Sequence, residues 1–215
     1  MPRIARRPDM PLTLLQSSAA RTPDTPRPPC PARLPSGPSR QRVLVAVTPL
    51  GPTHAPVLAY HSSVIVGRTE FSFSPLGVSA AAGPVSHRAL ASETRLIDCG
   101  RHLVDLSVFR SVICPLFTPG SYDLLKQNCN SFVDCALCFL TGRRLDQQYT
   151  KAESIGRFVD EYFSLVQTFS AGYYAPNPKA EDFSADDVAD GLSMLRLEMR
   201  RTRAGAMDFV GMVMV

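Results

Sequence analysis

The feature that most constrains this chain is a cysteine at the predicted start of a helix. The segment Asn128-Cys129-Asn130-Ser131-Phe132 leads into an apolar run, 132–140, which Gly142 closes. Asn128 is a favoured N-cap residue, so the pattern places Cys129 in the first turn of this helix. The partial positive charge at a helix N-terminus stabilises an anion and lowers the pKa of a thiol there. We therefore interpret Cys129 as a candidate nucleophile.

A histidine near the start of a predicted strand, Leu58 to Val66, is the candidate partner of this thiol. His61 lies 68 residues before Cys129. A cysteine and a histidine that are distant in sequence but adjacent in the fold are typical of cysteine-nucleophile hydrolases. In such a pair His61 takes the thiol proton, Cys129 attacks a carbonyl carbon, and His61 then protonates the leaving amine. The backbone N–H of Cys129 is one candidate oxyanion donor, and Asn128 or a residue beside His61 is the candidate for a second.

Other potentially catalytic or metal-binding residues are less clearly indicated by the sequence. Asp98 could orient His61 as a third group, but a cap at the end of its own strand is the favoured interpretation. Cys135 and Cys138 form a CxxC inside an apolar helix with no second CxxC, which favours packing over a metal or redox role. His87 lies in an Ala-, Gly- and Ser-rich loop, and no pattern assigns it a role. No metal or organic cofactor is implied.

The charge of the chain is unevenly distributed. The 215 residues have a net charge of +4, but residues 1–40 hold seven Arg and two acidic residues, whereas the other 175 residues carry 16 basic and 17 acidic groups. The folded part therefore gives no electrostatic case for nucleic-acid binding. No apolar stretch is long enough to cross a bilayer. Six cysteines without a secretory signal favour a reducing compartment, so we expect a cytoplasmic or nuclear protein.

Three regions are predicted along the chain. Residues 1–40 contain ten of the nineteen prolines and too few apolar residues to fold alone. Two interpretations of this region stay open: a disordered arm, which is favoured, and an organelle transit peptide, because the segment is rich in arginine and poor in acidic residues. Residues 41–170 are predicted to form one domain. Residues 171–215 are predicted to be a linker, a C-terminal helix and an apolar tail.

The hydrophobic pattern predicts strands first and helices afterwards. Strands are predicted at 43–47, 58–66, 69–74 and 94–98, with a hairpin turn at Gly67-Arg68 and loops at 49–56 and 75–92. Gly100 is predicted to end the last of these strands. Helices are predicted at 103–117, 129–140, 150–169 and 184–203.

This pattern resembles the PPPDE family, the group of permuted-papain-fold peptidases that includes the desumoylating isopeptidases. The resemblance runs from Val43 to Phe169 and is carried by the following segments: His61 to Val64, Glu70 to Phe73, Leu96 to Gly100, Tyr122 to Phe132 and Phe139 to Arg143. It implies an α+β, circularly permuted papain-like fold in which a small antiparallel sheet packs against helices. It also implies that His61 and Cys129 form the catalytic dyad, in the reverse of the order found in papain.

The resemblance implies cleavage of a peptide or isopeptide bond after the tail of ubiquitin or of a ubiquitin-like modifier such as SUMO. Conjugates of these modifiers are therefore the expected partners. Two alternatives stay open. Lecithin–retinol acyltransferase-like proteins also join a strand histidine to an Asn-Cys helix, but their motif typically runs NCEHF, whereas Asn130-Ser131 stands here. The second alternative is a binding module that kept the fold but has lost catalytic activity. The modifier, the oxyanion donors and the oligomeric state stay undetermined.

Overall fold

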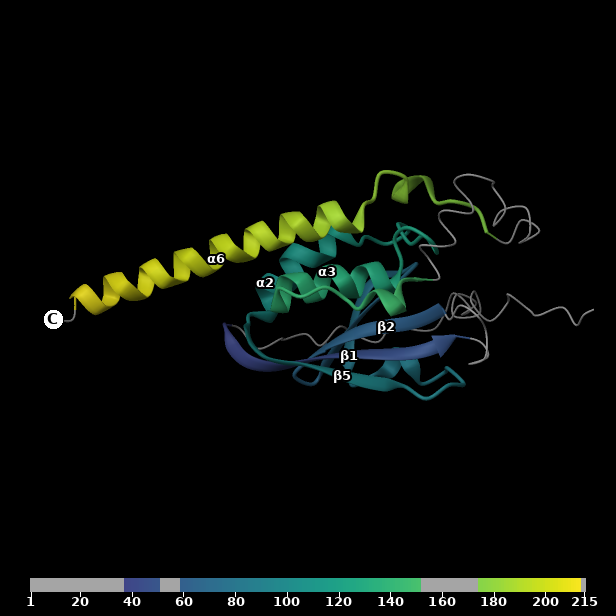
Figure 1. The fold of residues 1–215 in the computed structure, drawn as a ribbon, viewed down its shortest axis with the longest axis horizontal. Coiled ribbons are helices and arrows are strands. Elements are labelled where there is room, and N and C mark those ends of the chain that lie inside the picture. Colours follow the sequence, from purple (N-terminus) through teal and green to yellow (C-terminus); the bar gives the residue numbers. More distant parts are fainter. Residues whose placement is uncertain (1–36, 51–58, 152–173, 214–215) are drawn as a thin grey trace, which may run out of the picture.

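A five-stranded antiparallel sheet organises the protein (Figure 1). The computed structural model describes residues 37–50, 59–151 and 174–213. The order across the sheet is β4-β3-β2-β1-β5. The bounds are β1 (Ser39–Leu50), β2 (Ala59–Val66), β3 (Thr69–Ser74), β4 (Gly77–Ala82) and β5 (Arg95–Val104). With its helices, this sheet gives the α+β fold that the sequence predicted.

The predicted hairpin of β2 and β3 is confirmed, and a second hairpin follows it. Val66 pairs with Thr69 across the predicted turn. The segment 75–92 was predicted to be a loop, but it contains β4, which pairs with β3 along its whole length. The sequence of β4, Gly-Val-Ser-Ala-Ala-Ala, has weak strand propensity. Pairing with β3 therefore decides its conformation, and local preference does not.

β1 and β5 are longer than predicted. β1 continues through Pro49 to Leu50, and β5 continues through Gly100, which was predicted to end it. Gly100 has a φ of +94°, and the register of the β1–β5 pair shifts between Arg42 and Leu44. A glycine at positive φ permits such a bulge, after which the pairing resumes. The glycine thus bends β5 instead of ending it.

Helices α2 (Leu106–Ile113), α3 (Cys129–Thr141) and α6 (Ala185–Val213) lie on one face of the sheet (Figure 1). α2 begins later than predicted because residues up to Val104 belong to β5 and because Asp105 caps the helix. α3 begins at Cys129, as predicted, and Gly142 ends it in the left-handed conformation, with φ +77°. α6 runs ten residues beyond the predicted end at residue 203.

The apolar face of the sheet and these helices enclose the core. Its largest buried side chains come from both layers: Val43, Val45, Val64, Phe71 and Phe73 from the strands, and Phe109, Ile113, Phe117 and Phe132 from the other layer. Side chains alternate between the two faces of a strand. The residues of β1 and β2 that point away from this core therefore include Thr48, His61 and Ser63.

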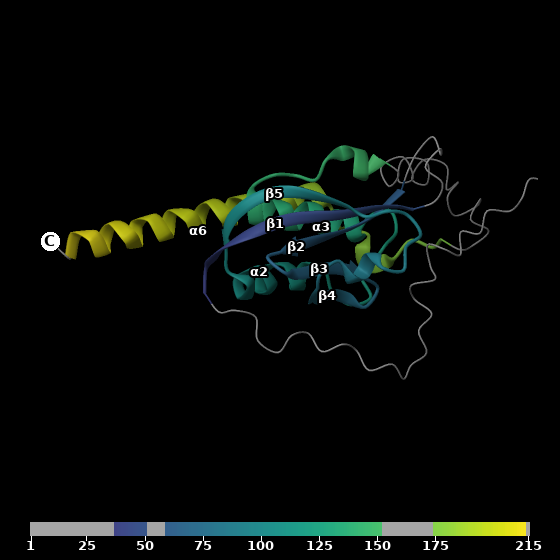
Figure 2. The same ribbon diagram turned by 90° about the horizontal axis from the view of Figure 1, so that it is seen from below.

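α6 is attached to α3 through the two cysteines of the CxxC. The thiol of Cys138 lies 3.3 Å from the carbonyl oxygen of Ala189, and that of Cys135 lies 3.8 Å from the carbonyl oxygen of Ala185. Both cysteines are buried, and burial raises the pKa of the Cys135 thiol to about 12. The predicted packing role of the pair is thus confirmed. Beyond this interface α6 projects past the sheet (Figure 2).

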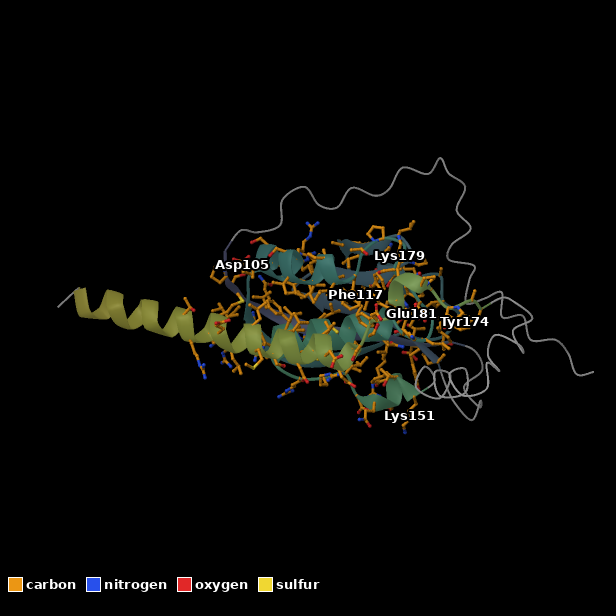
Figure 3. The ribbon with its side chains drawn as sticks, turned by 90° about the horizontal axis from the view of Figure 1, so that it is seen from above. Asp105, Phe117, Lys151, Tyr174, Lys179 and Glu181 are labelled. Atoms are coloured by element: carbon orange, nitrogen blue, oxygen red, sulfur yellow. The ribbon has the colours of Figure 1, made fainter. Side chains whose placement is uncertain are left out.

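The segment before α6 crosses the helical layer close to Phe117 (Figure 3). It carries Tyr174, Lys179 and Glu181, and it is held by the buried carboxylate of Asp123, which accepts hydrogen bonds from the Asn177 backbone at 2.8 Å and from the Tyr174 hydroxyl at 3.3 Å. Asp123 also accepts from the backbone of residues 125 and 126. It therefore ties this segment to the loop that leads into α3.

Two predicted features lie outside the described residues: the arm before residue 37 and nearly all of the helix at 150–169. Among the helices that the structure describes, none combines the length and the apolar character that a membrane span requires.

A glycine substitution at the end of α3 tests the left-handed cap. In Gly142→Ala the residue keeps a positive φ, and its methyl group comes within 2.5 Å of the Arg196 guanidinium. We expect a loss of about 1–2 kcal/mol in the free energy of unfolding, measured in urea. Gly191→Ala is the matched control, because nothing lies within 4 Å of its added methyl group and alanine favours a helix by up to about 1 kcal/mol. Equal effects of the two substitutions would contradict this account.

Candidate active site

The first turn of α3 is built by a reciprocal cap. The Asn128 side-chain oxygen accepts hydrogen bonds from the backbone N–H groups of Asn130 and Ser131, at 2.9 and 3.0 Å. The Ser131 hydroxyl oxygen accepts the backbone N–H of Asn128 at 2.8 Å. This capping box satisfies N–H groups that a helix start otherwise leaves unpaired. It fixes Cys129 as the first helical residue, where the helix dipole favours a thiolate.

Asn130 fastens this turn to β2. Its side-chain amide donates to the carbonyl oxygen of Tyr60 at 3.0 Å, and its side-chain oxygen accepts the Ser62 hydroxyl at 2.5 Å. Asn130 and Ser62 are almost fully buried, so neither hydrogen bond competes with bulk water. The two contacts lie on either side of His61 in the chain. They therefore set the position of the helix start relative to that histidine.

The Cys129 thiol lies against the backbone of the same strand. Its sulfur is 3.9 Å from the carbonyl oxygen of Tyr60, and the residue is 6% exposed. The carbonyl oxygen of Cys129 in turn faces the Ser62 hydroxyl at 3.3 Å. The structure thus brings the predicted nucleophile to the residues that adjoin the predicted base, although the two are 68 positions apart.

The imidazole of His61 lies on the side of the sheet opposite the apolar core. There, Nε2 is 2.9 Å from the Ser86 hydroxyl, and the ring centroid is 4.5 Å from that of His87. Burial, reinforced by the neighbouring His87, lowers the pKa of His61 to about 4, although Glu70 opposes this shift. The ring is therefore neutral at pH 7 and able to accept a proton.

A polar network around His61 was not predicted from the sequence. Glu70 on β3 is 2% exposed, and its carboxylate accepts hydrogen bonds from the Ser86 hydroxyl at 2.6 Å and from the backbone N–H groups of Val85 and Ser86. Val85 and Ser86 belong to a 3-10 turn, η1 (Val85–His87). The one available signal was a charged residue inside an aromatic strand, which implies a buried partner.

His87 is part of the same network. It is 3% exposed, and its ring nitrogens contact the hydroxyls of Thr48 at 2.7 Å and Ser63 at 2.9 Å. Burial lowers the pKa of His87 to about 4. The sequence assigned it no role because its partners lie on other strands and a loop pattern does not reveal them.

The structure does not bring Asp98 to His61. Asp98 pairs with Leu44 on one side of β1, whereas His61 pairs with Thr48 on the other side. The carboxylate of Asp98 accepts the Arg42 guanidinium at 2.8 Å and the Gly100 backbone N–H at 2.8 Å, and Arg42 holds the pKa of Asp98 below its ordinary value. These contacts of Asp98 are local, but β5 continues to Val104, so Asp98 lies at the bulge and does not cap a strand end as the sequence predicted.

The Asn128 side chain is engaged by the helix itself. Its oxygen serves the cap, and its amide donates to the carbonyl oxygen of Leu124 at 2.9 Å. In this arrangement Asn128 holds the first turn of α3 in place. Its role as an oxyanion donor, like that of the Cys129 N–H, stays a prediction.

The described residues include no cluster of three or more His, Cys, Asp or Glu side chains suited to a metal ion. A cleft of about 440 Å³ lies at the other end of α3, beside Leu140, and its rim includes Arg40, Arg101 and Arg196. Neither Cys129 nor His61 lines it, so the candidate reaction centre is separate from this cleft.

Comparison with known proteins agrees with this geometry. The model of a family described as the PPPDE putative peptidase domain matches residues 36–168. The human protein named desumoylating isopeptidase 1 is 29% identical over 99 residues, which cover 44% of this chain and 58% of that protein. The rat protein of the same name is 28% identical over the same length and shares. The chain thus matches little more than half the length of these relatives.

Removal of the Asn130 side chain tests the attachment of α3 to β2. In Asn130→Ala, the buried Ser62 hydroxyl and the Tyr60 carbonyl lose their partner, so we expect a loss of about 1–3 kcal/mol in the free energy of unfolding. Alkylation of Cys129 by iodoacetamide, followed by peptide mass mapping, should also slow. Ser111→Ala is the control, since the Ser111 hydroxyl bonds the backbone of Val108 on the exposed face of α2. If both variants match the wild type in stability and alkylation rate, the attachment is unimportant.

The two neutral histidines predict a pH dependence of stability. Their pKa values are about 4 in the folded protein, against 6.5 for the unperturbed side chain. Below pH 6.5 the unfolded chain therefore binds protons that the folded protein does not, and stability falls until pH 4. We expect a loss of about 2 kcal/mol for each histidine, or about 4 kcal/mol for the pair, between pH 7 and pH 5. His87→Gln should flatten this fall, whereas His102→Gln, outside the network, should not. If the free energy of unfolding falls as steeply with pH in His87→Gln as in the wild type, His87 is not a source of this pH dependence.

Proposed function

Because the chain belongs to the PPPDE putative peptidase family, we propose that it is a cysteine-type isopeptidase that removes SUMO or another ubiquitin-like modifier from proteins. Cys129 is the nucleophile and His61 is the general base. The names of the human and rat relatives support SUMO as the modifier.

One observation carries this proposal: the thiol at the start of α3 lies 3.9 Å from the carbonyl oxygen of Tyr60, the residue before His61. A thiol becomes a strong nucleophile only when its proton has a base to accept it. The helix dipole stabilises the resulting thiolate. A neutral imidazole, as the lowered pKa of His61 provides, is in the correct state to take the proton.

The reaction follows from these roles. The proton of the Cys129 thiol passes to His61, and the thiolate adds to the carbonyl carbon of the modifier's last residue. The C–N bond to the lysine amine then breaks while protonated His61 gives its proton to the leaving nitrogen. Water, deprotonated by His61, hydrolyses the thioester and releases the modifier with a free carboxylate. Backbone N–H groups at the helix start are the expected donors to the oxyanion.

Electrophilic modifier probes test both the nucleophile and the substrate class. SUMO and ubiquitin that carry a C-terminal propargylamide are incubated with the full chain, and adducts are read by intact mass. We expect a covalent SUMO adduct on the wild type, no adduct on Cys129→Ala, and at least about a hundredfold slower labelling of His61→Ala.

The other outcomes are equally informative. If only the ubiquitin probe labels the protein, the thiol peptidase assignment stands and the modifier is ubiquitin instead of SUMO. If neither probe reacts while Cys129 is alkylated rapidly by iodoacetamide, the thiol is active towards a different substrate and the isopeptidase proposal is wrong. Labelling that persists in Cys129→Ala would refute Cys129 as the nucleophile.

A further inference from the structure

Ser86 links the imidazole of His61 to a buried carboxylate. Its hydroxyl oxygen is 2.9 Å from Nε2 of His61 and 2.6 Å from Oε1 of Glu70. The second carboxylate oxygen of Glu70 accepts the backbone N–H groups of Val85, at 2.5 Å, and Ser86, at 3.1 Å. Both oxygens of Glu70 are therefore acceptors, and η1 is held against β3 by its first two residues.

The directions of these hydrogen bonds determine where the proton of neutral His61 sits. A serine hydroxyl has one hydrogen, and that of Ser86 is donated to Glu70. The Ser86 oxygen can then contact Nε2 only as an acceptor, so Nε2 carries the ring proton. In neutral imidazole the other nitrogen is unprotonated. Nδ1 of His61 is therefore the basic nitrogen.

Nδ1 is bonded to the ring carbon that joins the side chain, so it is the ring nitrogen nearer to the main chain of β2. The Cys129 thiol lies against that main chain, at the carbonyl oxygen of Tyr60. Within the described part of the chain, Nδ1 makes no hydrogen bond, so it is available to accept a proton. His87, whose ring is 4.5 Å from that of His61, is held by two hydroxyls and limits rotation of the His61 ring.

We propose that Glu70 and Ser86 are positioning residues that hold His61 as its Nε2–H tautomer, with Nδ1 presented to the Cys129 thiol. This inference rests on the proposed roles of Cys129 and His61. When Nδ1 takes the thiol proton, the new positive charge on the imidazole is stabilised by Glu70 through the Ser86 hydroxyl. No oxidant or cofactor enters, because one proton moves from sulfur to nitrogen.

The tautomer can be observed without any substrate. Long-range ¹H–¹⁵N correlation spectra of the full chain with ¹⁵N-labelled histidine, recorded at pH 7 on Cys129→Ala, should show His61 as the Nε2–H form with a slowly exchanging ring proton. Ser86→Ala in the same background should lose that slow exchange. A His61 ring in the Nδ1–H form would overturn the proposal.

The reactivity of the thiol gives a second readout. Alkylation of Cys129 by iodoacetamide at pH 7 should slow by between about tenfold and a hundredfold in Ser86→Ala and in Glu70→Gln. Ser86→Thr keeps the hydroxyl and should restore the rate to within about threefold of the wild type. Ser72→Ala is the matched control, because the Ser72 hydroxyl bonds Ser79, outside the network. Unfolding curves are recorded for all variants to establish that each is folded.

These results separate the inference from the proposed function. Equal losses in Ser86→Ala and Ser86→Thr would mean that residue 86 acts only through packing, which would overturn it. A wild-type alkylation rate in folded Ser86→Ala would also overturn it. The SUMO and ubiquitin probes can fail to react while His61 is observed as its Nε2–H tautomer and Ser86→Thr restores the alkylation rate. In that case the positioning role stands, and only the proposed substrate class is wrong.

Discussion

The rest of the site depends on the two hydrogen bonds between the Asn130 side chain and β2. They connect residues 70 and 68 positions apart and determine where the first turn of α3 meets the sheet. Each residue of a helix is rotated by about 100° from the one before it. A shift of α3 by a single position would thus turn the Cys129 thiol away from the strand that carries His61. The capping box formed by Asn128 and Ser131 gives this contact a rigid helix start.

The two faces of the sheet differ in chemistry, and the site uses both. One face is apolar and packs against α2 and α3, with rings such as Phe73 and Phe117 5.1 Å apart. The other face buries Glu70 and His87 and carries the half-buried His61. Buried polar groups without partners are costly. The hydroxyls of Thr48, Ser63 and Ser86 supply those partners and hold both imidazole rings in place. Burial lowers the pKa of both histidines and keeps them neutral at pH 7.

Sequence patterns predicted those elements whose conformation is decided by near neighbours. β2 and β3 were found because β-branched and aromatic residues flank a Gly-Arg turn, and α3 because an asparagine and a glycine mark its ends. β4 was missed, since an Ala-rich segment becomes a strand only through its partner. β5 was expected to stop at Gly100, but it continues, because the bulge opposite Arg42 and Leu44 accommodates the positive φ of this glycine. Arg42 also engages Asp98, which was considered as a partner of His61.

The sequence alone determined that Cys129 occupies the first turn of a helix and that His61 stands near the start of a strand. Both conclusions depend on contacts within a few residues, such as the cap from Asn128 to Ser131. Only the tertiary structure decided which groups surround His61. Glu70 and Ser86 are 9 and 25 positions away from it, on a neighbouring strand and a turn. Sheet pairing and burial create these contacts, and no local period of hydrophobic residues encodes them, because they depend on how distant segments stack.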